Sequence, residues 1–457
     1  GREDFVYRIS VGELPFVTGV FPLGARVGTD AAVRLTGWNL PADALDLDTS
    51  AGPDDVRTAV VRGGIVPSNP VHYAVGDLPE YSEPGNGTAP PMLELPRICN
   101  ARIAEPGEVD VYRFEGRAGQ EVVAEVTARR LRSPLDSLMQ LVGEDGQVLA
   151  WNDDHGRKDG HLHIGMGVLT HYADSYLRAE LPADGTYSIR VSDTRGHGGP
   201  EFAYRLRIST PRPDFEIRVV PSSISVKPRG TAPVNVVVLR KDGFDAPVDV
   251  SFLGEVPGFT LSGARVPRGV DSVMMTLGGP PRQDVPEKPL RVSLVGRARL
   301  DGREIARRAV PADDVMQAFL WRHLVPAEQL FLNVAGSMWH SFPLRGEVPA
   351  LLSIPSDGSA EVALQTRRGS GRLELQLKVT EPSSGLAIED IQFEGQELSF
   401  RVKADGEVMK PGQQGNLLVE VIGTLSPPEK EGQDAPKQAP TTRSFGLLPA
   451  MPFEIRE

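Results

Sequence analysis

The sequence has a single cysteine, Cys99, in 457 residues. One cysteine cannot form an intrachain disulfide, so the chain is not a disulfide-stapled scaffold of the kind common among small secreted domains. No apolar run approaches the ~20 residues that a membrane-spanning helix needs. We therefore expect no membrane span in this chain. No basic and apolar leader precedes the first domain either.

Acidic residues outnumber basic ones, 61 to 49. The formal net charge is −12 and the isoelectric point is near 5.3. Nucleic acids require a basic face to neutralise their phosphates, so this balance argues against a nucleic-acid partner. An acidic surface remains compatible with divalent cations.

Turn-forming residues are abundant instead, with 48 glycines and 40 prolines. Long helical periodicity is missing, whereas short alternating stretches recur, for example at 109–114 and 373–379. Alternation with a period of two, bounded by turn residues, predicts half-buried antiparallel strands. The length allows several domains. The sequence therefore predicts an all-β chain of tandem β-sandwiches.

The segment 98–209 carries the densest set of motifs. Its alternating strands and Asp-Gly turns fall at 107–120, 135–141, 152–154, 173–177 and 181–191. These motifs, in this order, resemble the bacterial pre-peptidase C-terminal (PPC) domain, a jelly-roll β-sandwich found beside secreted peptidases and in multidomain surface proteins. We place this domain at 92–212. It departs from the family by a long insertion at 155–173.

The flanking segments also read as β-sandwiches. The pattern at 17–24 and 32–40 resembles immunoglobulin-like IPT/TIG modules, which predicts one such domain plus a linker at 14–91. The segment 213–311 resembles bacterial immunoglobulin-like repeats, and 328–457 is expected to form a C-terminal sandwich. Between them we predict a helical connector at 312–327, with acidic residues at its start and Pro326 at its end.

The first residues repeat a later strand. The stretch 4–10 matches 201–209, the last strand of the PPC-like segment, at six chemically similar positions. We interpret 1–13 as the terminal strand of a preceding PPC-like domain that the given sequence does not include. A coincidental edge strand of the next domain is the alternative.

Catalytic signatures do not emerge from the sequence. It has no Gly-x-Ser-x-Gly elbow, no His-Glu-x-x-His zinc motif and no phosphate-binding loop. Cys99 lacks neighbours that would activate a thiolate. We therefore predict no catalytic residue in this chain.

Two groups of polar residues suggest metal binding. Calcium prefers six to eight oxygen ligands and tolerates irregular loops, so the first group is a hypothetical calcium site, with Asp110 as an outer candidate: Asp136, Asn152, Asp153, Asp154 and Asp174. The alternative is that these side chains accept hydrogen bonds from backbone N–H groups in turns. The second group could bind zinc or copper, or pack the inserted loop: His155, His161, His163 and His171.

Aromatic residues near these groups form a third candidate site. Trp151, Tyr172 and Tyr176 could stack on a carbohydrate, with packing as the alternative. The resemblance implies a non-catalytic protein that is secreted, periplasmic or on the cell surface, and we expect it to be a monomer. Its partner would be an extracellular polysaccharide or protein, bound for adhesion or substrate targeting. The alternatives are an accessory C-terminal region of a secreted peptidase or other hydrolase, and a metal-dependent enzyme centred on the inserted loop.

Overall fold

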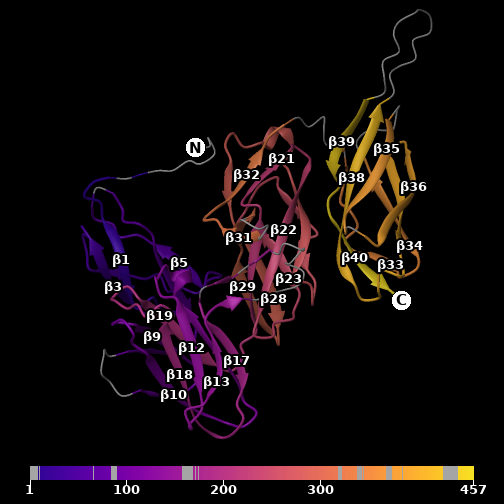
Figure 1. Cartoon of the computed structure of the whole chain (residues 1–457). Coiled ribbons are helices and arrows are strands. Elements are labelled where there is room, and N and C mark those ends of the chain that lie inside the picture. The colour runs from indigo at the N-terminus through magenta and orange to yellow at the C-terminus, as the bar shows by residue number, and fades with distance from the viewer. Residues whose placement is uncertain are drawn as a thin grey trace, which may run out of the picture. The chain divides into compact units, whose positions relative to one another are not determined.

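The computed structural model in Figure 1 describes residues 9, 11–64, 66–83, 90–156, 168–169, 171–172, 174–316, 322–336, 342, 344–366, 373–382, 384–425 and 441–457. The regular elements there are β-strands, with short 3-10 helices at Arg129–Leu131 (η1) and Arg282–Asp284 (η3). The predicted all-β class is confirmed. The chain divides into two compact units, one ending at Pro213 and the other beginning at Asp214. In the described part of the chain, no helix is long and apolar enough to cross a membrane.

The first sandwich packs two small sheets around one core. In β3, buried Val33 and Leu35 alternate with exposed Arg34 and Thr36, as the period-two pattern predicts. The sheets are ordered β1-β3-β4 and β2-β6-β5. Their strands are β1 (Phe16–Phe21), β2 (Gly24–Arg26), β3 (Ala32–Trp38), β4 (Ala44–Asp46), β5 (Val56–Ala59) and β6 (Val71–Gly76).

The second sandwich occupies the rest of the first unit. Its sheets are ordered β13-β12-β18-β10-β8 and β17-β11-β19-β9-β7, and both contribute to one fully buried core. The strands are β7 (Glu80–Ser82), β8 (Met92–Leu93), β9 (Arg97–Arg102), β10 (Asp110–Gly116), β11 (Glu121–Thr127), β12 (Ser137–Val142), β13 (Val148–Asn152), β17 (Tyr176–Glu180), β18 (Gly185–Asp193) and β19 (Ala203–Ser209). In the inserted segment, β14 (His155–Gly156) pairs with β16 (His171–Tyr172), and β15 covers Val168–Leu169.

The third sandwich begins the second unit. Its sheets include β31-β30-β20-β22-β26-β24, β21-β32-β27 and β25-β23-β28-β29. The strands are β20 (Asp214–Val220), β21 (Ser223–Val226), β22 (Thr231–Lys241), β23 (Val248–Phe252), β24 (Thr260–Ser262), β25 (Arg265–Val266), β26 (Ser272–Gly278), β27 (Leu290–Val292), β28 (Leu294–Leu300), β29 (Arg303–Arg308), β30 (Val310–Met316), β31 (Arg322–Pro326) and β32 (Leu330–Val334). Leu330 and Leu332 belong to its core, so this sandwich reaches beyond the predicted end at 311.

The helix predicted over 312–327 is wrong. The described residues of that segment form the antiparallel strands β30 and β31, with Ala312 opposite Pro326. β30 also pairs in parallel with β20, at Arg218 opposite Val310. Acidic residues at the start and a proline at the end satisfy helix rules locally, but the open edge of β20 offers backbone partners and buries Ala312 completely. Tertiary pairing therefore overrides local propensity.

The fourth sandwich ends the chain. Its sheets are β33-β40-β38-β35, with β39 also paired to β38, and β34-β37-β36. The strands are β33 (Leu352–Pro355), β34 (Ser359–Gln365), β35 (Leu373–Glu381), β36 (Leu386–Glu394), β37 (Glu397–Ala404), β38 (Gln414–Leu425), β39 (Thr441–Leu447) and β40 (Met451–Arg456). Within the second unit, Asn416 donates to the carbonyls of Gly263 and Met274 in the third sandwich, at 2.7 and 3.1 Å.

Candidate functional site

Asp174 is a buried hydrogen-bond acceptor at the start of β17. Its Oδ1 accepts the backbone N–H groups of Ala128 and Arg129 at 3.1 and 2.7 Å. Its Oδ2 accepts the Nε of Arg130 at 2.8 Å, and the backbone N–H of the same residue lies 3.4 Å away. The chain between β11 and η1 turns sharply here, which leaves N–H groups without partners in the sheet. Asp174 holds this turn against β17.

Asn152 ties the end of β13 to the start of β17. Its Oδ1 accepts the backbone N–H of Tyr176 at 2.9 Å, and its Nδ2 donates to the carbonyl of Asp154 at 3.0 Å. Asp136 lies 3.7 Å from the Nε of Arg195. Asp153 and Asp154 follow directly after β13 and are exposed.

The structure places the five predicted calcium ligands in different settings, some hydrogen-bonded and some exposed. Both oxygens of Asp174 and the amide oxygen of Asn152 already face N–H donors, which is the reverse of what a cation requires. Among the described residues, no three histidine, cysteine, aspartate or glutamate side chains are grouped closely enough to hold a metal ion. Asp174 accepts backbone hydrogen bonds, as the alternative describes, and calcium binding by the five residues stays a prediction.

The predicted histidine site falls largely outside the described residues. His161 and His163 lie there altogether. His155 and His171 belong to the paired strands β14 and β16, where His155 is opposite Tyr172 and His171 is opposite Gly156. A zinc or copper site stays a prediction.

The predicted aromatic platform is described in part. Trp151 is 63% exposed on β13, which pairs with β12 at Gln140. Tyr176 is half-buried at the first position of β17 and is anchored through its N–H by Asn152. Tyr172 lies in β16.

A buried polar chain crosses the core of the second sandwich. The Tyr204 hydroxyl donates to Oδ2 of Asp110 at 2.5 Å and lies 2.9 Å from the hydroxyl of Tyr112. Burial raises the pKa of Asp110 to about 7, and the charges of Glu83 and Glu108 add to this, against the opposing Tyr204 hydrogen bond. Asp110 was expected only as an outer calcium candidate. The alternation 110, 112, 114 could have revealed it, because it places a carboxylate on the same face as a core phenylalanine.

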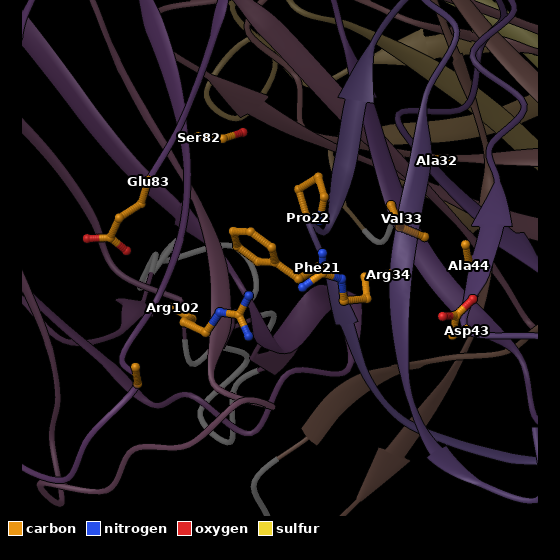
Figure 2. A pocket seen from close by; sticks show the side chains of 11 residues that line it. Phe21, Pro22, Ala32, Val33, Arg34, Asp43, Ala44, Ser82, Glu83 and Arg102 are labelled. Atoms are coloured by element: carbon orange, nitrogen blue, oxygen red, sulfur yellow. The ribbon is translucent and has the colours of Figure 1, made fainter. Parts of the chain in front are cut away.

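A cavity of about 770 Å³ lies within the first unit, beside the outer face of the β1-β3-β4 sheet (Figure 2). The first sandwich contributes Phe21, Arg34 and Asp43, and the second contributes Glu83 and Arg102. The Arg102 guanidinium carbon lies 4.1 Å from the centroid of the Phe21 ring. Figure 2 shows the Arg34 and Arg102 guanidinium groups pointing toward that ring from opposite sides. These residues were not predicted, since they come from strands that are distant in the sequence.

Comparison with known proteins finds a family match within the second sandwich. Residues 108–193 match the family model of the bacterial pre-peptidase C-terminal domain. The chain contains a PPC domain. It is also 33% identical over 138 residues to a probable subtilase-type serine protease of Deinococcus radiodurans. That match covers 30% of this chain and 16% of the protease, so the chain spans a small part of its relative.

Two solved structures show low overall similarity. The pre-peptidase C-terminal domain of a collagenase from Bacillus anthracis is 16% identical, with a TM-score of 0.19, and covers 27% of this chain and 100% of its own length. A marsupial T cell receptor is 13% identical, with a TM-score of 0.16, and covers 51% of this chain and 99% of its own.

The second sandwich supplies Arg102, one of the two arginines in the cavity lining. Burial lowers the pKa of Arg102, and the nearby positive charge of Arg34 lowers it further, against the opposing effect of Glu83. Burial also raises the pKa of Glu83, whose carboxylate accepts the backbone N–H of Arg102. Figure 2 shows the Glu83 carboxylate directed away from the Phe21 ring. The cavity is therefore lined by two guanidinium groups and by the carboxylates of Asp43 and Glu83.

Proposed function

We propose that this chain is a non-catalytic accessory region of a secreted bacterial peptidase, and that it holds the enzyme on its substrate. The observation that carries the proposal is the PPC domain at 108–193, together with the similarity to a subtilase-type serine protease. PPC domains accompany peptidases without performing the cleavage. Such a region acts outside the cytoplasm, in the medium, in the periplasm or at the cell surface.

Burial of the reactive groups of the second sandwich supports the proposed non-catalytic role. Cys99 is fully buried in the core, and burial raises the pKa of its thiol well above the usual value, which disfavours the nucleophilic thiolate. The titratable chain formed by Asp110, Tyr204 and Tyr112 is enclosed by the same core. A substrate cannot reach these groups without unfolding the sandwich.

Tethering gives such a region its physical effect. A binding module joined to a catalytic domain raises the effective concentration of the enzyme at an insoluble substrate. The gain requires no contact with the reacting bond. Adhesion by the sandwiches alone is the second candidate, and the exposed aromatic side chain of Trp38 on the first sandwich favours it.

The test joins this chain to the C-terminus of a subtilase-type catalytic domain and compares the fusion with the catalytic domain alone. We expect equal hydrolysis of a soluble peptide and about tenfold or faster hydrolysis of an insoluble protein by the fusion. The chain by itself should cleave neither substrate. Equal rates on the insoluble protein, or peptidase activity in the chain alone, would contradict the proposal.

A further inference from the structure

The cavity beside β3 brings together the guanidinium groups of Arg34 and Arg102, and the carboxylates of Asp43 and Glu83 also lie in its lining. Within the described part of the chain, neither Arg34 nor Arg102 forms an ion pair, and Arg102 instead covers the Phe21 ring at 4.1 Å. Holding two guanidinium groups near one ring is unfavourable, because the like charges repel and water is partly excluded. An anion placed between them would relieve both effects. Guanidinium groups bind carboxylates and sulfates through paired hydrogen bonds.

The same sheet face continues into an exposed aromatic pair. Phe16 on β1 lies directly opposite Trp38 on β3, and the two side chains are 51% and 71% exposed. Along β3, Trp38, Thr36 and Arg34 project from one face and all are exposed. Trp38 and Arg34 are four positions apart along the strand, a distance of about 13 Å. The aromatic pair, the Thr36 hydroxyl and Arg34 therefore follow one another along this face, with the backbone of Pro200 and Glu201 beside Gly19, the partner of Thr36.

We propose that this face binds an acidic polysaccharide, with a sugar carboxylate or sulfate between Arg34 and Arg102 and neighbouring sugar rings stacked on Trp38 and Phe16. Aromatic faces match the C–H faces of sugar rings. An acidic polypeptide is the competing occupant. Extended peptides commonly bind to a sheet edge through main-chain hydrogen bonds, whereas this site is the face of the sheet.

The negative net charge of the chain means that an acidic polymer can be held only at a particular site. With a net charge of −12, the protein repels a polyanion in general. Retention of an acidic polymer must therefore come from a local cationic site. This inference goes beyond the peptidase-accessory role, and its test is independent of hydrolysis.

The test measures binding of polygalacturonate to the intact chain by isothermal titration calorimetry. EDTA is present throughout so that no calcium bridges the polymer to acidic residues. Three variants are compared: R34Q and R102Q in the pocket, and W38A on the platform. R113Q is the matched control, since Arg113 is an exposed arginine of β10 outside the cavity. Circular dichroism and thermal melting establish whether each variant is folded. Because R34Q alters an exposed side chain, it tests the pocket even if R102Q does not fold.

We expect wild-type binding that weakens with salt. R34Q and R102Q should each lose about tenfold in affinity, W38A should lose several-fold, and R113Q should be unchanged. Neutral amylose should not bind. Three results would overturn the proposal: no binding of polygalacturonate, equal weakening by R113Q, or binding of poly-glutamate at least as tight as that of polygalacturonate. None of them bears on whether the chain assists a peptidase.

Discussion

Replacing Asp174 by alanine removes the acceptor that holds the turn before η1. Two backbone N–H groups, at 2.7 and 3.1 Å, and the Arg130 guanidinium, at 2.8 Å, lose a charged partner. Hydrogen bonds to charged groups contribute about 1.5–3 kcal/mol each. Arg130 keeps Glu125 and the carbonyl of Val126 as partners, which limits the loss. We expect the free energy of unfolding of the PPC domain to fall by about 3–5 kcal/mol.

Hydrogen exchange, measured by mass spectrometry on the intact chain, reports the loss of stability for each segment separately. The measurement therefore does not assume that this multidomain chain unfolds in a two-state transition. Protected amides of β11 and β12 should exchange at least a hundredfold faster in D174A, since each 1.4 kcal/mol is a factor of about ten. D153A is the control, because Asp153 is exposed in the same loop; its change should stay within about 0.5 kcal/mol.

Repeating the exchange measurement with and without calcium distinguishes the two possible roles of Asp174, hydrogen-bond acceptor and calcium ligand. As a hydrogen-bond acceptor, Asp174 should matter equally in EGTA and in calcium. If D174A exchanges like the wild type in EGTA and differs only when calcium is added, the acceptor role is refuted. Asp174 would then act as a metal ligand.

Three further predictions concern the second sandwich. Asp110, with its pKa raised to about 7, binds its proton more tightly when folded. The stabilisation from this bound proton is complete below about pH 4 and disappears by about pH 7. The free energy of unfolding, measured by urea titration, should therefore fall by up to about 4 kcal/mol over this range. D110N should remove this pH dependence, and a D110N protein with the same pH dependence as the wild type would contradict the prediction. Glu80 pairs with buried Arg205 at 2.7 Å. E80A should lower the free energy of unfolding by about 3 kcal/mol in the same assay, and a decrease below about 0.5 kcal/mol would contradict this. Calcium, if it binds the native state, should raise Tm; an unchanged Tm with no metal by elemental analysis contradicts the predicted site.

The positions of several strands along the chain were readable from the sequence. Alternation at 110–116 and 373–381 corresponds to β10 and β35, because a strand buried on one face imposes a period of two on its own sequence. The PPC motifs likewise lie within a single continuous segment, and the family model matches them at 108–193. The segment 312–327 was misjudged, because its partner β20 lies about 90 residues away and local propensity carries no record of it.

What each polar group does was decided by the tertiary structure. From the sequence, Asp174 is only a carboxylate in a loop. The structure shows that the N–H groups that donate to it come from residues 128–130. The sequence places Asp110 within an alternating strand, and the Tyr204 hydroxyl that holds it comes from a strand of the opposite sheet. The cavity follows the same rule, since Arg34 and Arg102 converge on Phe21 only after two sandwiches have folded. Backbone periodicity is a local property and is written into consecutive residues. Hydrogen bonds and charge pairs depend on distance in space, and folding alone determines that distance.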